Sequence, residues 1–110
     1  MNVLFVCTAA LQRSPTAAEV FLDLARKKKV SVNIKYAGIH VFAAPHVDNE
    51  LIAWADKIYA MEELHKNFML DINSDAAKKI KVLNIPDIYL RNSPELVRIL
   101  KEKLGREITP

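Results

Sequence analysis

The chain has 110 residues, of which 51% are hydrophobic and 26% charged, with a formal net charge of +3. This length allows one domain, expected over residues 1–110, and is too short for two. No apolar run approaches the roughly 18 residues of a membrane-spanning helix, and a single cysteine excludes an internal disulfide and a cysteine-rich metal site. The first residues show neither a basic segment nor a cleavage pattern, so we expect a cytoplasmic protein without a secretion signal.

The first predicted element is a buried strand that ends at the only cysteine. Residues 3–6 are β-branched, aliphatic and aromatic, as in a central strand of a parallel sheet. Ser14-Pro15 then predicts a helix start, with Ser14 as N-cap and Pro15 as the first helical residue. The Cys7 loop (residues 7–14) thus joins a strand to the amino end of a helix, where free N–H groups and the helix dipole favour an anion.

The next two elements are a helix and an edge strand. Apolar residues at helical spacing predict a helix over residues 15–28. The basic run 26–29 is typical of a solvated helix end, and nucleic acid is an unlikely partner for so short a run. Apolar and polar residues alternate over residues 30–36, which predicts a strand with one buried face that Ala37-Gly38 ends.

The rest of the chain continues this alternation. In chain order we expect a helix over 50–55, a strand over 57–61, a helix over 62–70, a helical turn over 76–79 and a strand over 80–85. The N-cap of the first of these helices is expected at Asp48 or Asn49. A last helix is expected to start at Ser93 and to have Gly105 as its C′ residue. The βαβαβαβα order predicts an α/β fold with a parallel sheet, right-handed crossovers and helices on both faces.

Two loops are expected to face one cleft. In open parallel sheets the ligand lies outside the carboxyl ends of the strands, where both the Cys7 loop and the loop containing Asp87 begin. A helix N-terminus and a nearby arginine favour the nucleophilic thiolate form of a cysteine, so Cys7 is the candidate nucleophile. The alternative for Cys7 is a buried structural thiol.

The Cys-x5-Arg-Ser spacing suits phosphoryl transfer. Backbone N–H groups of the loop can bind phosphoryl oxygens, and Arg13 offers a planar pair of donors. Ser14 can donate a hydrogen bond to the sulfur, and Asp87 can protonate the leaving oxygen and then activate water. The alternatives are a turn residue at position 87 and a surface or capping arginine at position 13. The substrate-binding candidates in the loop are Thr8, Ala9, Ala10, Leu11, Gln12 and Ser14.

These segments resemble the low molecular weight protein tyrosine phosphatases over nearly the whole chain. Residues 6–19 (VCTAALQRSPTAAE) resemble the phosphate loop and first helix of that family, residues 55–61 (ADKIYAM) its third strand, and residues 85–89 (IPDIY) its general-acid loop. Ala37-Gly38 resembles the end of its second strand. The resemblance implies the phosphotyrosine protein phosphatase I-like fold, a three-layer αβα arrangement with four parallel strands in the order 2-1-3-4.

The resemblance also implies an activity and its site. It implies hydrolysis of a phosphomonoester, above all protein phosphotyrosine, through a phosphocysteine without metal or cofactor. Cys7 would be the nucleophile, Arg13 the phosphate clamp, Ser14 the support of the thiolate and Asp87 the general acid and base, with Tyr89 at the aromatic entrance. The implied partners are a phosphorylated protein or a small phosphomonoester, with inorganic phosphate as product and no membrane. Phosphoarginine is another phosphoryl group that such a site can take.

The chain departs from the family at several positions. Ala9-Ala10 stand where Gly-Asn is usual, Gln12 replaces a second loop cysteine, and Ile88 replaces a proline. The segment after Gly38 is shorter than usual and offers only His40 and Phe42 as an aromatic wall.

Three alternative functions would use the same residues. The first is an arsenate reductase that depends on an external thiol, since this chain has no further cysteine. The second is a sugar-transport phosphocarrier, although such domains typically lack the clamp arginine and the late acid. The third is a module that binds phosphate or a phosphoprotein without turnover.

Overall fold

The computed structural model describes residues 1–108. Its elements follow in the order β1 (Asn2–Cys7), α1 (Arg13–Lys27), β2 (Asn33–Gly38), α2 (Asn49–Trp54), β3 (Lys57–Ala60), α3 (Glu63–Ile72), the 3₁₀ helix η1 (Ser74–Lys79), β4 (Ile80–Val82) and α4 (Pro94–Gly105). The predicted alternation of strands and helices is confirmed. None of the helices in this described part is long and apolar enough to cross a membrane.

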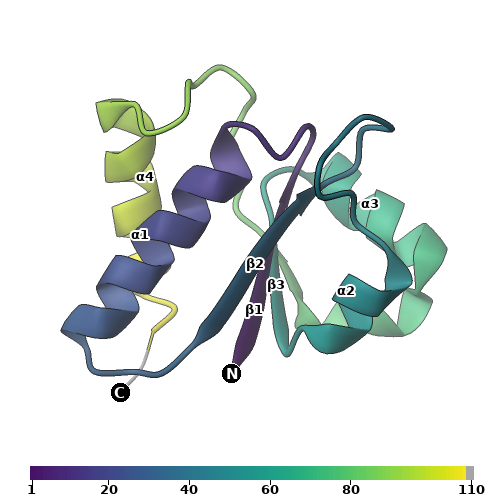
Figure 1. Ribbon diagram of the computed structural model, residues 1–110, viewed down its shortest axis with the longest axis horizontal. Helices are drawn as coiled ribbons and strands as arrows, with labels where there is room; N and C mark the ends of the chain where they lie inside the picture. The colour runs from purple at the N-terminus through teal and green to yellow at the C-terminus, as the bar shows by residue number, and fades with distance from the viewer. Residues whose placement is uncertain (109–110) are drawn as a thin grey trace.

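All four strands are parallel and form one sheet in the order β2-β1-β3-β4 (Figure 1). Val3 of β1 pairs with Ile34 of β2 on one side and with Lys57 of β3 on the other, so β1 is central. β2 lies at an edge, as its alternating pattern predicted. The predicted fold class and strand order are therefore confirmed.

The two faces of the sheet carry separate helix layers. α1 and α4 lie on one side and α2 and α3 on the other (Figure 1). Successive side chains of a strand point to opposite faces, so β1 contributes to both cores. Phe5 belongs to the core with Phe21 and Leu100, whereas Leu4 belongs to the core with Ile52.

α1 begins two residues earlier than predicted. Its N-cap is Gln12, whose side chain makes no capping hydrogen bond, so the prediction of Ser14 as N-cap is wrong. Pro15 is the third helical residue and is tolerated there because the first four N–H groups of a helix have no intrahelical partner. The earlier start places Ser14 inside the first turn, where its hydroxyl faces Cys7 instead of capping the helix.

Three other predicted boundaries are corrected. β2 extends through Gly38, and β4 ends at Val82 because Asn84 has a left-handed backbone (φ 57°) that interrupts the strand. Gly105 is the last residue of α4, not a C′ residue, and Arg106 caps the helix. The basic run was expected to be solvated, but the side chain of Lys28 makes a contact within the protein. Its Nζ donates to the carbonyl oxygen of Gly105 at 2.8 Å and so joins the ends of α1 and α4.

Candidate active site

The Cys7 loop and the Asp87 loop (residues 86–93) meet at the carboxyl end of β1. They enclose a cavity of about 220 Å³. The residues that line this Cys7 cavity are Cys7, Thr8, Ala9, Leu11, Gln12, Arg13 and Asp87. The structure therefore brings the three candidate catalytic residues together, with most of the loop around them.

The backbone of the Cys7 loop is held open by β2 and the residues that follow it. The carbonyl oxygen of Cys7 accepts from Ile39 N at 3.1 Å, and that of Thr8 accepts from His40 N at 2.8 Å. Ala10 turns the chain with a left-handed backbone (φ 61°). Within residues 1–108, no hydrogen bond uses the N–H groups of residues 8–12 as donors. These groups are thus available to an anion, as in other backbone nests.

Gly38 allows the Cys7 loop to approach β2 this closely. A Cβ atom at this position would lie 2.6 Å from the carbonyl oxygen of Thr8 and 2.8 Å from the backbone nitrogen of Ala10. Both distances are too short for a real side chain, and both partners are backbone atoms of the loop. The glycine that ends β2 is therefore required by the shape of the loop.

The sulfur of Cys7 has a hydroxyl partner beside it. Cys7 is 2% exposed, and its Sγ lies 3.0 Å from Oγ of the buried Ser14. A thiolate can only accept a hydrogen bond, so Ser14 must be the donor when Cys7 is ionised. This contact stabilises a negative charge on the sulfur.

Arg13 is buried and held by three hydrogen bonds. Nη1 donates to Glu62 Oε2 at 2.8 Å and to the carbonyl oxygen of Ile85 at 2.7 Å, and Nη2 donates to Thr8 Oγ1 at 3.2 Å. A guanidinium group has five N–H donors, so Nε–H and one N–H of Nη2 remain. These two donors share one edge of the planar group, and such an edge binds two oxygens of a phosphate at once.

Glu62 and His65 complete the site, and the sequence analysis did not single them out. Glu62 fixes Arg13, and His65 is fully buried with its Nε2 at 3.0 Å from Thr8 Oγ1. Burial and, secondly, the Arg13 guanidinium lower the pKa of His65 from 6.5 to about 4. A signal was present, because both residues follow the predicted third strand and a ligand lies at the carboxyl ends of such strands.

Asp87 borders the cavity from the opposite loop. Its carboxylate is 59% exposed, and Oδ1 lies 3.8 Å from Arg13 Nε. The Asp87 loop is attached to α1 at its far end: Gln12 Oε1 accepts from Arg91 N, and Thr16 Oγ1 accepts from Asn92 N at 3.0 Å. Gln12 therefore borders the cavity and also fastens the loop that carries Asp87.

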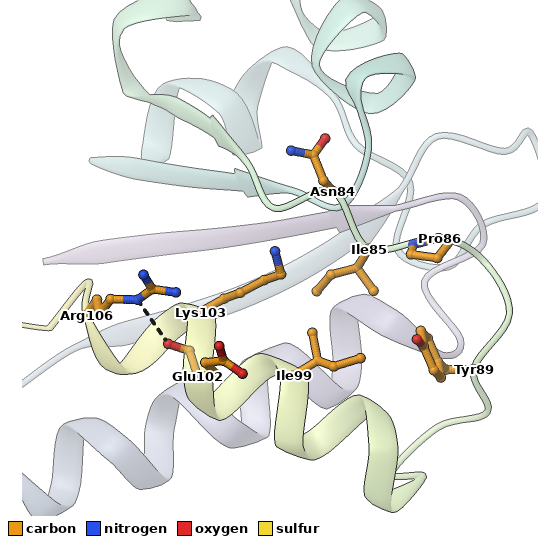
Figure 2. A pocket seen from close by; sticks show the side chains of 8 residues that line it. All are labelled: Asn84, Ile85, Pro86, Tyr89, Ile99, Glu102, Lys103 and Arg106. Atoms are coloured by element: carbon orange, nitrogen blue, oxygen red, sulfur yellow. Dashed lines mark hydrogen bonds between the residues drawn. The ribbon is translucent and has the colours of Figure 1, made fainter.

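Tyr89, which was expected at the aromatic entrance, is not among the residues that line the Cys7 cavity. Its ring lies in a different pocket, of about 330 Å³, beside Ile85 and Ile99 of α4 (Figure 2). A γ-turn, in which Ile88 N donates to the carbonyl oxygen of Pro86, bends the chain at Asp87. The bend separates the acid from the tyrosine two residues later.

Part of the chain is similar to a curated protein. No family model matches the chain. The protein-arginine-phosphatase of Bacillus subtilis (strain 168) is 31% identical in an alignment of 93 positions, with 63% of this chain covered. The match covers 61% of that protein, so the chain spans less than two thirds of the relative's length.

Solved structures share the fold over nearly the whole chain. A low molecular weight protein tyrosine phosphatase from Bacillus subtilis superposes with a TM-score of 0.72 at 25% identity, covering 97% of this chain and 99% of that one. Vibrio vulnificus Wzb, in complex with benzylphosphonate, superposes with a TM-score of 0.78 at 18% identity, covering 97% of this chain and 98% of that one.

Proposed function

We propose that the chain is a member of the low molecular weight protein tyrosine phosphatase family and that it hydrolyses phosphomonoesters through a phosphocysteine on Cys7. The observation that supports this most directly is the content of one cavity. Its lining includes the Cys7 thiol with its hydroxyl partner, Arg13 with two free donors, and the carboxyl group of Asp87. The other lining residues are Thr8, Ala9, Leu11 and Gln12, whose backbone N–H groups donate no hydrogen bond within residues 1–108. Each of these groups has a role in phosphoryl transfer.

In the first step the Cys7 thiolate attacks phosphorus. The S–P bond forms as the bond to the leaving oxygen breaks, and Asp87 transfers its proton to that oxygen. The equatorial oxygens carry the developing charge, and the loop N–H groups and Arg13 bind them. The products of this step are the free alcohol or phenol and phosphocysteine.

In the second step water hydrolyses the phosphocysteine. The Asp87 carboxylate, left without its proton, removes a proton from water as the water oxygen attacks phosphorus. The S–P bond breaks, the electron pair returns to sulfur, and Ser14 stabilises the thiolate by the 3.0 Å contact. Inorganic phosphate leaves, and Asp87 is protonated again.

Protein phosphotyrosine is the substrate that the surroundings of the cavity favour. Leu11 gives the cavity an apolar wall and is 62% exposed. Val41, Phe42, Ile88 and Leu90 are also exposed, on the loops that follow β2 and β4. Exposed apolar side chains suit contact with an aromatic ring and its flanking peptide, and the structure of Wzb is a complex with benzylphosphonate. Phosphoarginine is the second candidate, because the curated relative is a protein-arginine-phosphatase.

Hydrolysis of para-nitrophenyl phosphate without added metal tests the activity. We expect Cys7→Ser to abolish turnover and Asp87→Asn to lower kcat by about 100-fold, because a positioned acid is lost. Phosphocysteine trapped in Asp87→Asn, detected by mass spectrometry, would support the nucleophile and the acid together. Undiminished turnover in Cys7→Ser would exclude the mechanism. Phosphate binding without any turnover would favour the binding module.

A comparison of two phosphopeptides separates the substrate classes. We expect kcat/KM for a phosphotyrosine peptide with apolar flanking residues to exceed that for the phosphoarginine peptide of the same sequence. The reverse order would overturn the assignment to phosphotyrosine and leave the phosphocysteine mechanism intact.

A further inference from the structure

The Thr8 side chain has a role beyond its backbone N–H group. We propose that the Thr8 hydroxyl donates a hydrogen bond to the phosphoryl group above Cys7, and that His65 is the positioning residue that directs the hydroxyl proton into the cavity. This inference rests on the proposed function only in naming the ligand as a phosphoryl group. The first step of the argument concerns the protonation of His65.

The hydrogen bonds of His65 fix its tautomer. Nδ1 accepts a hydrogen bond from the backbone N–H of Glu62 at 2.9 Å. A backbone amide can only donate, so Nδ1 carries no proton. The neutral ring then has its proton on Nε2, which lies 3.0 Å from Thr8 Oγ1. His65 is therefore the donor in its contact with Thr8.

Thr8 Oγ1 receives a second hydrogen bond from Arg13. Nη2 of Arg13 donates to it at 3.2 Å, and a guanidinium has no acceptor. A hydroxyl oxygen has two lone pairs and one proton. Both lone pairs of Thr8 are thus occupied by His65 and Arg13, and the proton of the hydroxyl has to point elsewhere.

The Cys7 cavity is the place where this proton can find an acceptor. Thr8 lines the cavity together with Cys7 and Arg13. Among residues 1–108, no protein atom accepts a hydrogen bond from Thr8 Oγ1. A phosphoryl oxygen bound by the free N–H of Arg13 Nη2 would lie beside this hydroxyl. An O–H bond to a charged oxygen is among the stronger hydrogen bonds in proteins.

Arg13 does not depend on Thr8 for its position. Its Nη1 is held by Glu62 at 2.8 Å and by the Ile85 carbonyl oxygen at 2.7 Å. Loss of the Thr8 hydroxyl therefore removes a donor from the cavity while the guanidinium stays in place. This separates a binding role of Thr8 from a role in holding Arg13.

Phosphate binding to three forms of the protein tests the role of Thr8. The dissociation constant of inorganic phosphate is measured by ³¹P NMR titration of the wild type, Thr8→Ser and Thr8→Val. We expect Thr8→Ser to bind like the wild type and Thr8→Val, which has nearly the same shape, to bind at least about tenfold more weakly. The ¹⁵N–¹H signal of Arg13 Nε in the phosphate-free protein should be the same in all three.

Two results would overturn the role of Thr8. One is equal phosphate affinity in Thr8→Val and the wild type. The other is a displaced Arg13 Nε signal in Thr8→Val, which would mean that Thr8 acts by holding the arginine. If the wild type binds phosphate with the expected difference between the variants but shows no turnover, the proposed function fails and this inference stands.

A pair of substitutions at position 65 tests the positioning role. A glutamine side chain can place an N–H donor near the position of His65 Nε2, whereas methionine has no donor. We expect His65→Gln to keep phosphate affinity close to that of the wild type and His65→Met to weaken it, with both variants folded by circular dichroism. Equal phosphate affinity in His65→Met and the wild type would exclude the positioning role.

Discussion

Single residues of the site are held by hydrogen bonds that leave specific donors free. Arg13 uses three of its donors on the protein and keeps two for a ligand, and Thr8 uses both lone pairs and keeps its proton. His65 supports this arrangement only in its neutral form, because a protonated Nδ1 would face the N–H group of Glu62. The site is therefore arranged before a ligand arrives, which lowers the cost of binding.

The buried His65 makes stability depend on pH. Its pKa is about 4 in the folded protein and 6.5 in its ordinary state. Between these values the unfolded chain binds a proton that the folded protein does not, so the free energy of unfolding falls as pH decreases from 6.5 to 4. The full loss is about 3 kcal/mol. We expect urea denaturation at several pH values to show this loss in the wild type.

A variant at the same position isolates this effect from other titrating groups. His65→Gln cannot bind the proton, so the difference in unfolding free energy between the two proteins should shrink as pH decreases from 6.5 to 4. A difference that stays constant over this range would contradict a neutral buried histidine at position 65.

Among the elements, the junction of β1, β2 and α1 decides the geometry of the site. The loop after β1 contacts Gly38 at the end of β2, and α1 starts early enough to place Ser14 beside Cys7. The two glycines of the chain allow a direct test. A Cβ added at Gly38 would lie too close to backbone atoms of Thr8 and Ala10 and to the Cβ of Ala43, whereas a Cβ added at Gly105 would have no atom within 4 Å.

We expect Gly38→Ala to displace the Cys7 loop and Gly105→Ala to leave it unchanged. The first substitution should lower the free energy of unfolding by about 1–3 kcal/mol and abolish most phosphate binding. The second should raise the free energy of unfolding by about 0.5–1 kcal/mol, because alanine is the better helix former. Thermal or urea denaturation and a phosphate titration measure both. Unchanged phosphate binding in Gly38→Ala would contradict the role of this glycine.

The elements themselves were largely predictable, while their ends and the contacts of the site were not. Periodicity identified the strands and helices because each buries one face or both, as in β1 and β2. Ser14-Pro15 misplaced the start of α1 because proline fits any position of a first helical turn. Glu62 and His65 contact Arg13 and Thr8, which are distant in sequence, and periodicity does not predict such contacts. The position of Tyr89 is set by a γ-turn that a single sequence does not reveal.

At the scale of the whole molecule, the strand order brings together site residues that are far apart in sequence. β1 and β3 are neighbours, so the ends of both strands supply the site, Cys7 from the first and Glu62 with His65 after the second. The Asp87 loop reaches the same edge after β4 and is fastened to α1 by Gln12 and Thr16. The family resemblance implied this order, which periodicity alone does not determine.

The carboxylates that position Arg13 also cancel its charge at a distance. Glu62 lies 2.8 Å from the guanidinium and Asp87 lies 3.8 Å away, so the phosphate-free cavity has no excess of positive charge from its side chains. A phosphate ester is then captured by short hydrogen bonds and not by a long-range field. Raising the ionic strength from about 0.01 M to about 0.15 M shortens the Debye length from about 30 Å to about 8 Å, and kcat/KM should hardly change. Asp87 still balances Arg13 when Glu62 alone is replaced. The double variant Glu62→Gln, Asp87→Asn leaves the charge of Arg13 uncompensated and should make kcat/KM fall with added salt. Equal salt dependence in the double variant and the wild type would contradict this cancellation.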